Sequence, residues 1–114
     1  MLFLVELDHV RTGPPPTPES GRAFIEQVIF PTLARAEQLA AERKIVAGGP
    51  IAGRIALRLM IEADSVEHVD RIVTTIPLWT QAEVRITPLI TFAERREHLQ
   101  TLLSDLARRS GGQS

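Results

Sequence analysis

The sequence predicts one α+β domain in which two helices cover one face of a four-stranded sheet. Apolar and polar residues alternate with the period of two that a strand requires in three segments: 2–10, 54–62 and 83–92. Helical spacing of apolar residues, or a short apolar run, marks the segments between them: helices at 17–43 and 65–75 and a strand at 44–47. The order βαββαβ is the ferredoxin-like split βαβ pattern, for which we expect the strand order 4-1-3-2.

Turn and cap residues mark where the first elements begin and end. Thr17 followed by Pro18 is typical of a helix N-cap with proline at the first helical position. Pro31 interrupts the apolar periodicity of this helix, so we expect a kink or two helical pieces near residues 29–30. Gly-Gly-Pro at 48–50 is expected to end the short second strand.

An extra C-terminal helix completes the predicted domain. Thr91 and Glu94 form a capping box that opens a helix over about 92–109. It carries one apolar stripe, formed by Leu99, Leu102, Leu103 and Leu106. We expect one domain over 1–109, followed by a flexible tail at 110–114.

The composition excludes several classes of function. The chain has 114 residues and no cysteine, which removes disulfides, thiolate metal sites and a cysteine nucleophile together. The formal charge of −1 attracts neither nucleic acid nor an anionic membrane. No apolar run approaches the roughly 20 residues of a membrane span, and the run at 1–5 is too short for a signal peptide. We therefore expect a cytoplasmic protein. No cofactor or zinc motif occurs, so we expect neither a cofactor nor a metal.

The two faces of the predicted sheet differ in character. The face toward the helices is apolar and includes Phe3, Val5, Leu7, Ile55, Leu57, Leu59, Ile61, Val84, Ile86 and Ile90. The opposite face is mixed, with Leu2, Leu4, Met60 and Leu89 beside Glu6, Asp8, Arg58, Arg85 and Thr87. An apolar patch of this kind marks an interface when it is left bare. We therefore expect a homodimer, or a higher homo-oligomer, whose sheets enclose a barrel-like interior.

Charged residues on the mixed face suggest a binding site. The predicted strand order places Glu6 between Arg58 and Arg85, and the remaining positive charge is suited to bind the carboxylate of a small anionic metabolite. The same groups are also suited to pair with one another across a dimer interface without any ligand. Met60, on the same face, and Trp79, after the second helix, are candidate substrate contacts, although Trp79 is equally suited to cover the core.

Several short segments resemble those of the muconolactone Δ-isomerases. They are Met1-Leu2-Phe3 with Val5, Ile51-Ala52-Gly53, Ala56, Ser65-Val66-Glu67, Ile76-Pro77-Leu78-Trp79 and Glu83-Val84. The resemblance implies a dimeric α+β barrel that moves a double bond in a small carboxylated lactone by proton transfer and without a cofactor. The histidine that members carry after Met-Leu-Phe is Leu4 here, and a charged stretch of their first helix reads Pro31-Thr32-Leu33.

The candidate groups for proton transfer are Asp8, Glu6 and His9. Two arginines stabilise the charged form of Glu6, so Asp8, nearer the rim, is the better candidate base. His9 alternates onto the helix side, where a histidine without a catalytic role is the simpler interpretation. Two other functions stay open: a non-catalytic dimeric small-molecule-binding or accessory protein, and a cofactor-free monooxygenase, which normally has a more aromatic interior.

Overall fold

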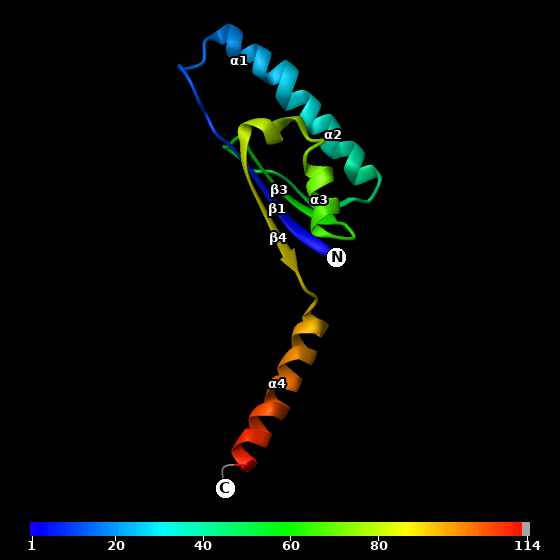
Figure 1. Ribbon diagram of the computed structural model, residues 1–114. Coiled ribbons are helices and arrows are strands. Elements are labelled where there is room, and N and C mark those ends of the chain that lie inside the picture. The colour runs from blue at the N-terminus through cyan, green and yellow to red at the C-terminus, as the bar shows by residue number, and fades with distance from the viewer. Residues whose placement is uncertain (113–114) are drawn as a thin grey trace.

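The computed structural model describes residues 1–112 and has the predicted ferredoxin-like architecture (Figure 1). In chain order, the elements are β1 (Leu2–His9), α1 (Pro18–Phe24), the π-helical turn η1 (Ile25–Ile29), α2 (Phe30–Ala41), β2 (Ile45–Pro50), β3 (Ala56–Glu62), α3 (Val66–Val73), the 3-10 helix η2 (Pro77–Gln81), β4 (Ala82–Leu89) and α4 (Phe92–Gly112). The sheet is antiparallel with the order β2-β3-β1-β4, which confirms the predicted order. Helices α1, α2 and α3 lie on one side of it (Figure 1).

The apolar face of the sheet forms the core with α2, α3 and η2. Phe3, Val5 and Leu7 of β1 are completely buried and pack with the inward residues of β3. Helices α2 and α3, the turn before η2 and η2 itself contribute Leu39, Val69, Ile72, Val73, Ile76 and Leu78. The helix-facing alternation predicted from the sequence is therefore correct within the strands.

Two residues assigned to that face are only partly covered. Ile55 is 46% exposed and Ile90 is 53% exposed. Both lie just beyond the strands, because β3 begins only at Ala56 and β4 ends at Leu89. Ile55 nevertheless lines a cavity with residues of α1, η1 and α2. Alternation fixes the direction of a side chain only while the backbone is a strand.

The helical run at 18–41 is interrupted as expected. The backbone N–H of Phe30 bonds to the carbonyl of Ile25, five residues earlier, so η1 is a π-helical turn between α1 and α2. Pro31 then falls in the first turn of α2, directly after this π-helical turn, and has no N–H to donate to the turn before it. At the other end of α1, Thr17 and Ser20 cap each other's backbone N–H groups, which confirms the predicted N-cap.

The second strand is longer than predicted. Gly48, Gly49 and Pro50 continue β2 beside β3 instead of ending it at residue 47, after a bulge between Ile45 and Ala47. Gly48 has a φ of 113°, and a Cβ atom on it would lie 2.1 Å from the carbonyl oxygen of Arg58. Gly48 therefore allows β2 and β3 to lie close together, in a backbone conformation that residues with a side chain rarely adopt.

Helix α4 continues from the end of β4 and projects away from the domain (Figure 1). It runs to Gly112, so residues 110–112 belong to the helix and not to the predicted tail, and positions 113–114 lie outside the described residues. Glycine disfavours a helix interior but is common at a C-terminal end, where boundaries vary by a residue or two. Phe92 and the four leucines of its apolar stripe are all exposed. The molecule consequently measures 75 Å along its longest axis and 32 and 25 Å along the others.

Within residues 1–112, the structure holds no helix of the length and apolar character that a membrane span requires.

Candidate functional site

A row of charged side chains crosses the face of the sheet that the helices leave bare. Glu6 on β1 pairs in register with Arg58 on β3 and with Arg85 on β4. Its Oε1 atom lies 3.3 Å from Nε of Arg58, and its Oε2 atom lies 3.9 Å from Nη1 of Arg85. The structure thus brings together the three charged residues that the sequence placed on this face.

Asp8 and its partner Arg54 extend this row to five residues. Its Oδ1 atom accepts hydrogen bonds from Nη2 of Arg54 at 2.7 Å and from Nη2 of Arg58 at 3.2 Å. The charged row is therefore Arg54, Asp8, Arg58, Glu6 and Arg85, in which each carboxylate lies between two guanidiniums. The expected contrast between Glu6 and Asp8 was wrong, because Arg54 gives Asp8 a second guanidinium as well; Asp8 differs only in being more exposed, at 32% against 22%. Sequence reasoning did not name Arg54 as a site residue, because Arg54 precedes β3 and the alternation of the strand does not fix its direction.

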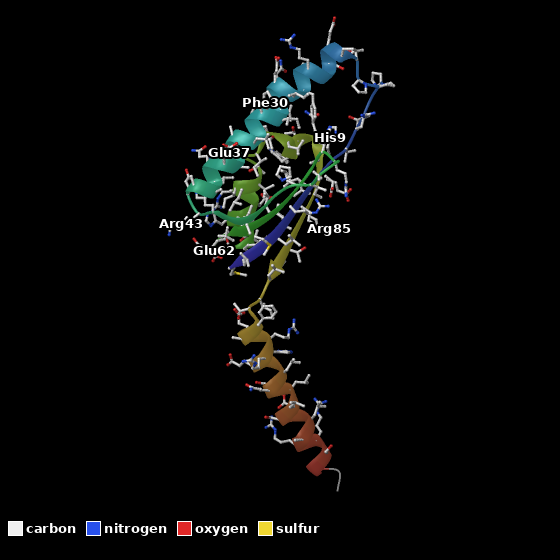
Figure 2. The ribbon with its side chains drawn as sticks, turned by 180° about the vertical axis from the view of Figure 1, so that it is seen from behind. His9, Phe30, Glu37, Arg43, Glu62 and Arg85 are labelled. Atoms are coloured by element: carbon white, nitrogen blue, oxygen red, sulfur yellow. The ribbon has the colours of Figure 1, made fainter. Side chains whose placement is uncertain are left out.

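The two arginines beside Glu6 differ in how many of their donors already have a partner. Arg58 binds Glu6 and Asp8, and its Nη1 atom donates to the backbone oxygen of Leu57 at 3.0 Å. Among residues 1–112, Arg85 makes only the 3.9 Å contact, and its side chain is 73% exposed. Figure 2 shows Arg85 on the side of the sheet away from α1 and α2. Arg85 is accordingly the guanidinium in the row that is best placed to accept a further anion.

The members of the charged row other than Arg54 line a small hollow of about 110 Å³, which Glu83 also lines. Glu83 lies opposite Asp8 in the register of β1 and β4. With Glu83, three carboxylates face three guanidiniums, so the row has no surplus positive charge. The predicted surplus was wrong because the sequence argument counted neither Glu83 nor Asp8 in the balance.

The other half of the bare face is apolar. Leu2 lies opposite Leu89, and Leu4 lies opposite Met60 and Thr87. All five side chains are half-buried. Met60 therefore shares a face with the charged row, but lies one register pair beyond Glu6 and Arg58, in the apolar half.

His9 and Trp79 lie elsewhere. The His9 ring is 4.8 Å from the ring of Phe24, at the end of the sheet nearest α1 (Figure 2). Trp79 lies on η2 and lines a broad surface hollow with α3 and with Val84 and Ile86 of β4. Since Val84 and Ile86 point into the core side, Trp79 is across the sheet from Glu6 and Arg85. The structure does not bring these two predicted residues into the charged row.

The described part of the chain contains no cluster of three or more histidine, aspartate or glutamate side chains arranged to hold a metal ion. The carboxylates of the charged row are instead held by guanidiniums.

Comparison with known proteins shows that the chain has a known fold. The sequence matches no family model, and no curated protein matches it. Among solved structures, the chain is similar to the crystal structure of muconolactone isomerase at 3.3 Å resolution, with 22% sequence identity and a TM-score of 0.64. The similarity covers 80% of this chain and 90% of that one. The chain therefore has the fold of muconolactone isomerase.

Proposed function

We propose that this protein is a homodimeric, cytoplasmic isomerase that shifts a double bond in a small carboxylated lactone, or a similar metabolite, by proton transfer. The observation that carries the proposal is the charged row on the bare face of the sheet, in a chain with the fold of muconolactone isomerase. In this row, Asp8 and Glu6 each form ion pairs with two arginines. Carboxylates are suited to move protons, and guanidiniums are suited to hold a substrate carboxylate.

The chemistry needs only these side chains. Arg85, which has donors to spare, binds the substrate carboxylate. Asp8 removes a proton from the carbon beside the double bond, the electron pair shifts by one position, and the proton returns to the far carbon. No electron is gained or lost in this reaction, so it requires no oxidant. Glu6 holds Arg58 in place, and Arg58 in turn orients Asp8.

A second copy of the chain completes the site in this proposal. Leu2, Leu4, Met60 and Leu89 leave an apolar patch beside the charged row, and a sheet packed against it would cover this patch and close the hollow above Asp8. The exposed leucines of α4 are a second apolar surface that the same partner could cover. The absence of cysteine from the sequence fits a cytoplasmic protein that folds without disulfides.

Proton exchange tests the proposal directly. Muconolactone is incubated in D₂O with the wild type and followed by NMR, and we expect deuterium incorporation and isomerisation. Asp8→Asn should lower the rate by about a hundredfold or more, since it removes the base. Arg85→Ala should lower kcat/KM at least tenfold, whereas Arg22→Ala, an exposed arginine on α1, should leave the rate unchanged. An unchanged rate in Asp8→Asn would contradict the mechanism.

A non-catalytic dimeric protein is the second candidate. It is favoured by the charge balance of the row and by the complete engagement of Arg58, which are properties of an ion-pair network that serves assembly. Native mass spectrometry distinguishes the two readings. A dimer without exchange activity, which Arg58→Ala converts to monomer, would favour assembly over catalysis.

A further inference from the structure

The apolar stripe of α4 is left uncovered by the rest of residues 1–112. Phe92 extends this stripe toward the sheet, and Phe92, Leu99 and Leu106 recur at intervals of seven residues, with Leu102 and Leu103 between them. The five side chains are between 45% and 95% exposed, and Figure 1 shows α4 clear of the sheet and of the other helices. A seven-residue apolar repeat is the pattern of a helix that packs along a second helix.

A second copy of the chain offers an identical stripe, and two arginines decide its direction. Arg95 and Arg109 lie seven residues before and seven residues after Leu102, so they point along the same stripe. In a parallel pair, equal positions face each other, and each of these arginines would meet its own copy. In an antiparallel pair, Arg109 faces Phe92 of the second copy and Arg95 faces Leu106 of the second copy, so the like-charge contacts disappear.

The carboxylates of α4 also fit the antiparallel direction. Asp105 lies on the same edge of the stripe as Arg95, and antiparallel pairing brings Asp105 of one copy beside Arg95 of the other. Glu94 comes within reach of Arg109 in the same way. Within residues 1–112, the side chains of Glu94, Arg95 and Arg109 form no ion pair, while Asp105 binds Arg108 of its own helix. Two-fold symmetry repeats each contact, and opposite ends of the two helix dipoles then lie together.

We propose that α4 pairs antiparallel with α4 of a second copy of this chain. The occupant of the stripe is another copy because the stripe is complementary to itself in apolar spacing and in charge. A helix that lacks tertiary contacts also loses the packing that stabilises most helices, and the pairing restores it. The pairing adds a contact to the proposed homodimer but does not rest on the isomerase reaction, since α4 projects away from the charged row (Figure 1).

Single cysteines map this pairing directly, because the chain contains none of its own. The positions of Phe92→Cys and Arg109→Cys lie about 25 Å apart along one helix, so only antiparallel pairing brings them within disulfide reach between copies. Under mild oxidation, each variant alone should remain largely monomeric in denaturing mass spectrometry. An equimolar mixture of the two should form the mixed disulfide at least about tenfold faster than either variant forms its own. Glu97→Cys, on the far face of α4, is the matched control and should cross-link with neither.

Charge exchange tests the same pairing without oxidation. Asp105→Arg should raise the dissociation constant about tenfold at low salt, because two symmetry-related contacts with Arg95 become repulsive. Adding Arg95→Asp should restore the affinity, and Glu97→Arg should leave it unchanged; light scattering over a dilution series measures all three.

Two results would overturn the proposal: disulfides in Phe92→Cys or Arg109→Cys alone but not in their mixture, which would indicate parallel helices, or a mixture no faster than Glu97→Cys, which would indicate that something else covers α4. Mixed disulfides in a protein without proton-exchange activity would support the pairing and contradict only the proposed isomerase function.

Discussion

Helices α3 and α4 are both amphipathic, but they differ in what covers their apolar faces. Helix α3 has eight residues and buries three of them, Val69, Ile72 and Val73, against the sheet. Helix α4 has 21 residues, and the leucines of its stripe are exposed throughout. The sequence pattern identifies an apolar face in each case, whereas the path of the chain decides whether the face meets the core. Helix α3 lies between two strands that return it to the sheet, and α4 leaves from the end of an edge strand.

The largest difference between the packed domain and α4 is expected for glycine replacements, one on β2 and one on α4. Gly48→Ala should lower the free energy of unfolding by about 4 kcal/mol or more, because the new Cβ would clash with the backbone of β3 at a positive φ. Gly111→Ala in α4 should be neutral or slightly stabilising, since a Cβ there meets no atom within 4 Å. Urea unfolding followed by circular dichroism measures both, and equal effects would break the comparison.

A smaller contrast is expected for core truncation in the two helices. Ile72→Ala should destabilise the domain by about 3 kcal/mol, because it leaves a cavity under α3. Leu106→Ala should change the unfolding free energy of the monomer by less than about 0.5 kcal/mol, as is usual for exposed positions. Thermal unfolding at low protein concentration gives both values. A loss of more than about 1 kcal/mol in Leu106→Ala would indicate that the domain itself covers α4.

The smallest effect on stability, but a measurable one on assembly, is expected along the stripe of α4. Leu102→Ser with Leu106→Ser should leave the domain folded and raise the dissociation constant of the proposed homodimer about a hundredfold or more, since each exposed leucine that a partner covers contributes about 1.5 kcal/mol or more. Gln100→Ser, off the stripe, is the matched control. Light scattering across a dilution series measures the mass, and an unchanged dimer would show that α4 takes no part in it.

The sequence predicted the strand order and much of the charged row for a simple reason. Alternation in β1 assigns Phe3, Val5 and Leu7 to one face and Glu6 to the other, and the split βαβ order then places Glu6 between Arg58 and Arg85. Both rules are local or topological, so they do not depend on packing details.

What the sequence did not predict depends on contacts between distant segments. Gly48 reads locally as a turn residue, and only its pairing with β3 makes it part of a strand. The hydrogen bond of Arg54 to Asp8 depends on the conformation that the long arginine side chain adopts toward a residue 46 positions away in the sequence. Trp79 lies on a 3-10 helix whose placement follows from a buried hydrogen bond between Thr32 and Leu78. None of these contacts leaves a periodic signal.

The projecting α4 also sets the hydrodynamic behaviour of the chain. The Cα radius of gyration is 20.3 Å, while a compact chain of this length has about 13 Å. Frictional drag follows overall extent more than mass, so a lone protomer of 12.6 kDa would diffuse and elute like a considerably heavier compact protein. If a partner covers α4, assembly would double the mass while adding proportionately less drag, and the dimer would migrate closer to its true size than the monomer does.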